Sequence, residues 1–131
     1  MITFLDTDIC IAILRGKEPL LEAKLMQLPL SSIKLSSVVV AELWVGVEKS
    51  QNPEKAEQKL QTFLNALSTE PFTEKSARIY GQIRGNLEKR GLSIGANDLL
   101  IAAIALEQEG TLITRNYREY ERIKNLKVEV W

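Results

Sequence analysis

The feature that most constrains the fold is an alternation of short apolar runs with longer segments whose apolar residues recur at helical spacing. The short runs lie at residues 2–5, 33–35, 111–114 and 128–130. The helical segments between and after them lie at residues 9–14, 21–28, 38–47, 53–67, 74–90, 98–109 and 117–123. Strands that alternate with helices are typical of a parallel sheet covered by helices. We therefore expect an α/β fold with a mostly parallel sheet.

One helical segment is apolar on nearly every side. It runs from Asp98 to about Glu109, with Asn97 as its expected cap and Gly110 as the residue that stops it. A helix on the surface of a protein carries one apolar stripe, whereas a helix that is apolar all round is buried. This segment is therefore predicted to be the central helix of the fold.

The size and charge of the chain set limits on its organisation and partners. With 131 residues, 45% of them hydrophobic and 26% charged, the chain has the size of one globular domain, so we expect residues 1–131 to form a single domain. No apolar run approaches the length of a membrane span, which leads us to expect a cytoplasmic protein with no membrane partner. Because 17 basic residues balance 17 acidic ones, any surface that binds nucleic acid must be local.

The chain contains no histidine and only one cysteine, Cys10. Histidine is the usual base of serine and cysteine hydrolases and the commonest protein ligand of transition metals, so those chemistries are excluded in their ordinary form. A single cysteine cannot form a disulfide within the chain, and Cys10 in an apolar run is predicted to be a small buried hydrophobic residue. Catalysis would have to use carboxylates, lysine, hydroxyl groups or a cofactor.

Three carboxylates occupy positions where a carboxylate is costly. Asp6 follows the first apolar run, at the end of a predicted strand where open parallel sheets bind ligands. Glu42 interrupts an apolar helix, and the residues three and four positions away carry no charge that could pair with it. Asp98 begins the predicted central helix, where the helix dipole favours an anion. Taken singly, each also has a structural explanation, as a helix cap, a solvent-facing glutamate and an N-terminal acid.

Taken together, the three acids suggest a metal site. If they converge, each ionised carboxylate raises the pKa of the others, and the cluster destabilises the fold unless a cation lies between them. Oxygen ligands without histidine favour Mg²⁺ or Mn²⁺.

Four segments of the chain resemble the motifs of PIN-domain ribonucleases, and within that family those of the VapC-like toxins. They are Phe-Leu-Asp-Thr-Asp-Ile at residues 4–9, the segment at 36–43 that contains Glu42, the segment at 97–103 that contains Asp98, and the tail at 112–123. They follow the family's order and span nearly the whole chain. The resemblance implies a three-layer α/β/α PIN-like domain with endoribonuclease activity that depends on Mg²⁺ or Mn²⁺. It also implies a homodimer that acts on RNA and is inhibited by a cognate antitoxin.

On this resemblance Asp6, Glu42 and Asp98 hold the metal and form the catalytic centre. The commonest family pattern has a fourth acid, which in this chain is replaced by Asn116. Glu119 lies three residues further on and is the candidate substitute, with an ion pair to a neighbouring arginine as its alternative role.

Several polar residues are candidates for supporting roles. The hydroxyl groups of Thr7 and Thr114 could bind a ligand carboxylate or a water, although ordinary turn chemistry is the favoured explanation for both. Arg84, Arg115 and Arg118 are weaker candidates for contacts with RNA phosphates, and a solvated helix face is the alternative.

Two other functions remain open from the residues alone. A strand that ends in Asp6-Thr7-Asp8 also resembles the nucleophile loop of haloacid-dehalogenase-like phosphatases, in which Asp6 would be the nucleophile and Asp8 the acid. That family needs a later acidic pair, for which the chain offers only Asp98. A non-catalytic domain that binds a partner is the third possibility. The presence of all three acids argues against it, and metal binding would decide.

Overall fold

The computed structural model describes all 131 residues, which form a five-stranded sheet and seven α-helices. The strands are β1 (Thr3–Leu5), β2 (Ile33–Ser36), β3 (Ser68–Glu70), β4 (Thr111–Thr114) and β5 (Lys127–Val130). Their order across the sheet is β3-β2-β1-β4-β5, and every neighbouring pair is parallel. The prediction of a mostly parallel sheet is therefore confirmed, since no strand is antiparallel.

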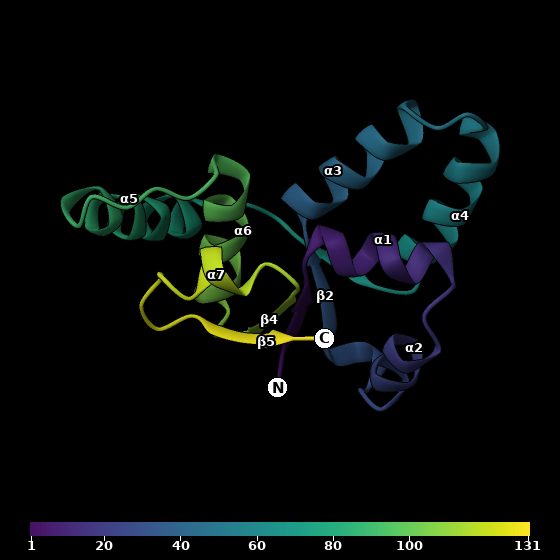
Figure 1. Cartoon of the computed structure of the whole chain (residues 1–131), viewed down its shortest axis with the longest axis horizontal. Coiled ribbons are helices and arrows are strands. Elements are labelled where there is room, and N and C mark those ends of the chain that lie inside the picture. Colours follow the sequence, from purple (N-terminus) through teal and green to yellow (C-terminus); the bar gives the residue numbers. More distant parts are fainter.

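The helices cover both faces of this sheet. They are α1 (Thr7–Arg15), α2 (Pro19–Met26), α3 (Ser37–Glu48), α4 (Pro53–Asn65), α5 (Glu74–Lys89), α6 (Ala96–Glu107) and α7 (Tyr117–Tyr120), with a 3₁₀ turn at Leu30–Ser32. In Figure 1, α1, α3 and α4 lie on one side of the sheet, and α6 lies on the other side with α5 packed against it. The three-layer α/β/α architecture is thus confirmed.

The central strand is buried on both sides because helices cover it on both sides. Thr3, Phe4 and Leu5 of β1 are all buried, and Phe4 lies opposite Lys34 of β2 and Leu112 of β4. The sequence Ser-Thr-Glu of β3 has no apolar residue, and this strand lies at the edge of the sheet with its first two residues exposed. The hydrophobic pattern therefore does not predict β3.

Helix α6 is the central helix, as its composition predicts, but its boundaries differ from the expectation. It begins at Ala96 after Gly95 and has no side-chain cap, so the expectation that Asn97 caps it is wrong. Asn97 is exposed in the first turn, and the backbone N–H of Leu99 already bonds the carbonyl of Gly95. Asp98 is consequently the third helical residue.

Gly110 takes part in the C-terminal cap of α6, which ends at Glu107, because its N–H bonds the carbonyl of Ala105 at 2.9 Å. It also has a packing role. A Cβ atom on Gly110 would lie 2.7 Å from the ring of Phe4, so only glycine allows the start of β4 to approach β1 this closely.

One continuous apolar core fills the space between the sheet and the helices. Six residues of α6 are buried in this core or beside it: Leu99, Ile101, Ala102, Ala103, Ile104 and Ala105. Cys10 is completely buried, as predicted for a small hydrophobic residue, and this burial raises the pKa of its thiol. No helix combines the length and apolarity needed to cross a bilayer.

Candidate active site

The candidate site lies at the carboxyl ends of β1 and β4, where the strand order of the sheet reverses. From β1 the chain continues to β2 and β3 on one side, and it returns to β4 and β5 on the other. A crevice forms at such a switch point, and open α/β sheets bind their ligands there. Asp6 directly follows β1 and Thr114 ends β4, and the N–H of Asp6 bonds the carbonyl of Ile113 at 2.9 Å. The sheet therefore places these two side chains next to each other.

Asp6 is a buried carboxylate with both oxygens bonded. It is 4% exposed, its Oδ1 accepts a bond from the Thr7 N–H at 2.9 Å, and its Oδ2 accepts one from the Thr114 hydroxyl at 2.6 Å. Burial raises the pKa of Asp6 from 3.8 to about 6, although the bond from Thr114 opposes this shift. Asp6 is thus the N-cap of α1, as one interpretation of the sequence had it, and also the acid at the switch point.

Asp98 approaches Asp6 from the first turn of α6. Its Oδ1 accepts a bond from the Tyr120 hydroxyl at 3.1 Å, and the amide nitrogen of Asn116 lies 3.4 Å from its Oδ2. The pKa of Asp98 is raised, first by burial and then by the negative charges of nearby acids, Glu42 foremost.

Glu42 is joined to the same site through Thr7. The Thr7 hydroxyl donates to Oε1 of Glu42 at 2.6 Å, while the Thr7 N–H donates to Asp6. Thr7 and Thr114 therefore both donate to a carboxylate. The Thr114 hydroxyl also accepts the backbone N–H of Asn116, two residues further on, so the expected turn chemistry is confirmed for Thr114 and is not the role of the Thr7 hydroxyl. Glu42 is only partly exposed, so it is not a simple solvent-facing residue.

The acids converge without forming a closed ligand set. No three acidic side chains gather at a spacing that would enclose an ion. At the same time, no lysine or arginine forms a salt bridge with Asp6, Glu42 or Asp98. Carboxylates that are partly or fully buried without a cation are costly, and their oxygens are the ligands that Mg²⁺ and Mn²⁺ prefer. The chemistry of these donors therefore fits a divalent cation, although their spacing in this structure does not enclose one.

Tyr120 is the site residue that the sequence does not reveal. It is completely buried, and its hydroxyl oxygen lies 3.1 Å from Asp98 Oδ1 and 3.4 Å from Asp6 Oδ1. The spacing offers a signal in retrospect: Asn116 and Tyr120 are four residues apart and linked by a backbone bond across α7, so they share one helical face.

Glu119 shows features of both roles considered for it. Its Oε2 lies 3.9 Å from Nη1 of Arg122, which is a long ion pair on the surface. Its negative charge also contributes to the raised pKa of Asp98. The backbone N–H of Asn116 bonds the Thr114 hydroxyl at 2.9 Å, so the residue at the fourth-acid position is held in the site.

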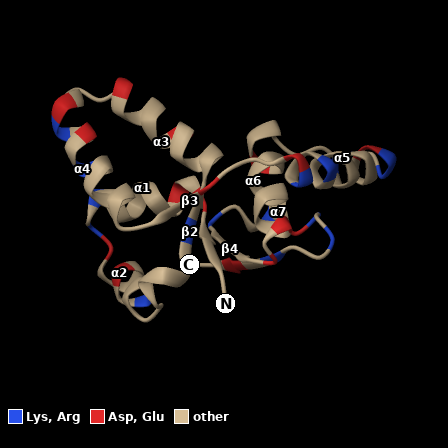
Figure 2. Ribbon diagram, turned by 180° about the vertical axis from the view of Figure 1, so that it is seen from behind, with Lys and Arg blue, Asp and Glu red and all other residues tan.

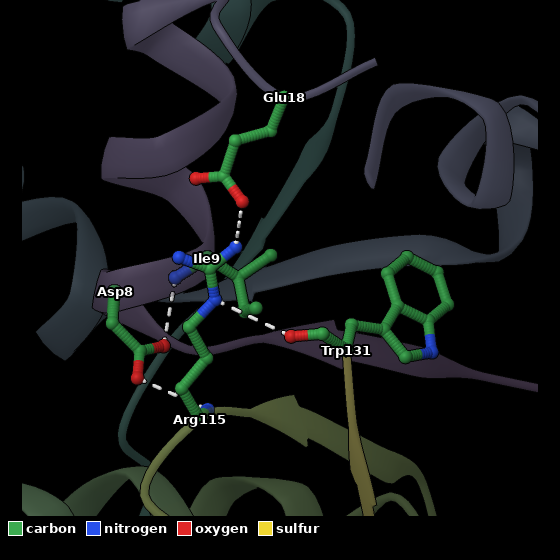
Figure 3. Close-up of polar contacts among 5 residues, drawn as sticks. All are labelled: Asp8, Ile9, Glu18, Arg115 and Trp131. Atoms are coloured by element: carbon green, nitrogen blue, oxygen red, sulfur yellow. Dashed lines mark hydrogen bonds and ion pairs between the residues drawn. The ribbon is translucent and has the colours of Figure 1, made fainter. Parts of the chain in front are cut away.

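Arg115 forms contacts within the protein (Figure 3). Its guanidinium group binds Glu18 and the carbonyl of Trp131, and its backbone N–H donates to Asp8 Oδ2 at 3.0 Å. The other oxygen of Asp8 accepts the N–H of Ile9 at 2.7 Å. Because both oxygens of Asp8 accept backbone bonds, Asp8 is suited to hold the loop after β4 and poorly suited to act as the acid of a phosphatase.

The other two candidate arginines lie on exposed surfaces. Arg84 pairs with Glu88 at 2.9 Å and bonds the Tyr80 hydroxyl, whereas Arg118 is exposed and has neither an ion pair nor a side-chain hydrogen bond. Basic and acidic residues both occur along α4 and α5, with no continuous basic stripe along either helix (Figure 2). Contacts of Arg84, Arg115 and Arg118 with RNA stay a prediction.

The sequence matches known proteins over nearly its full length. The family model described as "PIN domain" matches residues 3–126. A relative named "Ribonuclease VapC2" from Rickettsia felis is 42% identical over 132 residues, which cover 100% of this chain and 98% of the relative. A relative named "tRNA(fMet)-specific endonuclease VapC" from Shigella flexneri is 34% identical over 127 residues, with 97% and 96% covered.

Solved structures give the same result for the fold. VapBC2 from Rickettsia felis, bound to a DNA fragment from its promoter, matches with a TM-score of 0.93 at 40% identity and covers 100% of this chain and 99% of that one. DNA-bound VapBC from Salmonella typhimurium matches with a TM-score of 0.94 at 31% identity, with 100% and 98% covered. The chain therefore belongs to the PIN-domain family, and to the VapC branch within it.

Proposed function

We propose that this protein is the toxin of a toxin-antitoxin pair, an endoribonuclease that hydrolyses RNA phosphodiester bonds with Mg²⁺ or Mn²⁺. The observation that carries the proposal is the pair of acids at the switch point of the sheet, Asp6 and Asp98, which share a hydroxyl group and have no basic partner. The names of the VapC relatives support the choice of RNA as substrate.

Asp6 and Asp98 would hold the cation, and Glu42 would join them from α3. When bound, such an ion supplies an activated water and offsets the charge that develops on the phosphate oxygens. This chemistry needs no covalent nucleophile, in keeping with a chain that has no histidine. We expect products with a 5′-phosphate and a 3′-hydroxyl.

The neighbouring residues keep the acids oriented and ionised. Thr114 and the Thr7 N–H fix both oxygens of Asp6, and the Thr7 hydroxyl fixes one oxygen of Glu42. With a pKa of about 6, Asp6 is mostly ionised at neutral pH, as a metal ligand must be. Carboxylates held in place in this way spend little conformational entropy when they bind an ion.

The comparisons also support a protein partner. The solved relatives are VapBC complexes, so we expect an antitoxin to neutralise this protein. From the resemblance to the VapC-like toxins we also expect a homodimer. A groove between α1, α3 and α4 has an apolar lining that includes Leu14, Leu43 and Leu60, and its polar lining includes Glu42, Arg15 and Lys59. A protein segment seated in this groove would lie beside Glu42 and could hinder the approach of RNA.

The test is cleavage of RNA by the purified protein. We expect cleavage with Mn²⁺ or Mg²⁺, none after chelation by EDTA, and none by Asp98→Asn under either condition. Because the Shigella relative is named for tRNA(fMet), that RNA is the first substrate to compare with ribosomal and messenger RNA. Cleavage that persists in EDTA, or in Asp98→Asn at the wild-type rate, would contradict the proposal.

A further inference from the structure

We propose that Tyr120 is a positioning residue of the acid site, because its buried hydroxyl lies between Asp6 and Asp98 and orients them for a divalent cation. The inference rests on the proposed metal-dependent function and adds a residue that is neither acidic nor a metal ligand. It concerns the orientation of the two carboxylates before an ion arrives.

The hydroxyl group of Tyr120 has no partner other than these carboxylates. Its oxygen lies 3.1 Å from Asp98 Oδ1 and 3.4 Å from Asp6 Oδ1, and the side chain is completely buried. A buried phenol needs only one acceptor, for which a backbone carbonyl would suffice. Here the protein instead places the hydroxyl between two groups of like charge, where it separates them and bonds the nearer one.

The two acids depend on Tyr120 to different degrees. Asp6 is held at both oxygens by Thr7 and Thr114 without it. Asp98 has only the phenol at 3.1 Å and the longer contact from Asn116 at 3.4 Å. A phenol carries a single proton, so it donates fully to one acceptor, and the shorter distance makes Asp98 that acceptor. Tyr120 is therefore the principal hydrogen-bond donor to Asp98.

The ring of Tyr120 is well fixed, so the hydroxyl has a defined position. It belongs to the apolar core, and its carbonyl accepts the N–H of Ile123 at 3.0 Å. Without the hydroxyl, Asp98 would keep only the longer contact from Asn116 at 3.4 Å, so its repulsion from Asp6 would turn it away more easily. Residues that orient the ligands of a metal typically change its affinity by about 10- to 100-fold.

The experiment compares Mn²⁺ binding by wild type, Tyr120→Phe and a matched control, Tyr117→Phe. Tyr117 lies on the same short helix, is 45% exposed, and makes no side-chain hydrogen bond. Mn²⁺ affinity is measured by calorimetry and by electron paramagnetic resonance, without RNA. We expect about tenfold weaker binding for Tyr120→Phe and wild-type binding for Tyr117→Phe. Because phenylalanine retains the ring, circular dichroism should show an intact fold.

A second measurement separates positioning from a purely structural role. If Tyr120 orients the acids, Tyr120→Phe should need about tenfold more Mn²⁺ for half-maximal RNA cleavage and should approach the wild-type rate when Mn²⁺ saturates the site. Unchanged Mn²⁺ affinity in Tyr120→Phe would overturn the positioning role alone. A wild-type protein that binds no Mn²⁺ would overturn the proposed metal-dependent function together with it.

Discussion

The two ends of helix α6 each carry a partly buried carboxylate, but the two differ in their hydrogen-bond donors and in the charges near them. At the C-terminal end, Glu107 accepts the hydroxyl of Thr73 at 2.9 Å and that of Ser76 at 2.5 Å. These two residues form the capping box of α5, so Glu107 lies at a helix N-terminus, where the dipole favours an anion. At the N-terminal end, the dipole of α6 also favours an anion, but Asp98 has only one phenol and one distant amide as hydrogen-bond donors and lies near the charges of other acids.

This difference shows that the partners of a carboxylate separate a structural role from a functional one. The negative charge of Glu107 is balanced by hydrogen bonds and a helix dipole within the folded chain. The negative charge of Asp98 is balanced only in part, and a cation from solution would balance the rest. Substitutions that remove the charge should therefore have opposite effects on stability at the two ends of the helix.

The largest expected effect is the loss of cleavage in Asp98→Asn. The change removes one charge from a group of repelling carboxylates and keeps the shape of the side chain, so stability should hold or rise while RNA cleavage disappears. Cleavage assays and thermal unfolding measure the two effects. A variant that fails to fold would show that Asp98 is a structural cap, and one that cuts RNA at the wild-type rate would remove it from the site.

The pH dependence of stability should show the cost of the uncompensated acids. The pKa of Asp6 rises from 3.8 to about 6 on folding, so the folded state binds the proton more tightly than the unfolded state does. Protonation of Asp6 therefore stabilises the folded state. This stabilisation is complete below about pH 4 and is lost as the pH rises through about 6, and the total loss is at most about 3 kcal/mol. Urea unfolding of the metal-free protein between pH 4 and 8 measures this, and Asp6→Asn should flatten the dependence. An unchanged profile in Asp6→Asn would assign the effect to other groups.

At the other end of α6, Glu107→Gln should destabilise the protein and leave catalysis intact. Glu107 accepts a hydrogen bond from each of two hydroxyl groups, one at each oxygen. A glutamine has an NH₂ group in place of one oxygen, so it cannot accept the second of these bonds. We expect the free energy of unfolding to fall by about 2 kcal/mol, as for the loss of a hydrogen bond to a charged group. Urea unfolding at pH 7 tests this, with RNA cleavage measured below the transition. If Glu107→Gln were as stable as the wild type, Glu107 would have no structural role, and the contrast between Glu107 and Asp98 would fail.

Much of the fold can be predicted from the sequence because its strands and central helix are apolar. β1, β2, β4 and β5 follow from apolar runs, and α6 from its uniform hydrophobicity. β3 cannot be predicted this way, because an edge strand of polar residues is recognised only by the backbone of its neighbour, which it meets where Ser36 pairs with Glu70.

The acidic residues of the site can be predicted from the sequence, whereas its tyrosine cannot. Asp6, Glu42 and Asp98 stand out because each interrupts or borders apolar sequence. Tyr120 does not, since an aromatic residue in a short amphipathic helix looks like an ordinary core residue. Only the three-dimensional structure shows that its ring is in the core while its hydroxyl lies between two acids.

The smallest expected effects concern the position of the fourth acid. Glu119→Gln should slow cleavage and weaken Mn²⁺ affinity severalfold, less than Asp98→Asn does, because Glu119 acts on Asp98 only through its charge and is shared with Arg122. Asn116→Asp should tighten Mn²⁺ binding by adding an anionic oxygen beside Asp98. Calorimetric titration with Mn²⁺ measures both. Wild-type behaviour of Glu119→Gln would leave three acids in the site and assign the fourth role to Asn116 or to the RNA.

Thermal unfolding with and without Mn²⁺ tests most directly that the acids at the switch point hold a divalent cation. An ion that binds only the folded state stabilises it by about 2.7 kcal/mol at a hundredfold excess over Kd. The melting temperature of the wild type and of Glu107→Gln should therefore rise by similar amounts, and the rise should disappear in Asp6→Ala and Glu42→Ala. Equal shifts in all four proteins would mean that the ion binds elsewhere and would contradict the assignment.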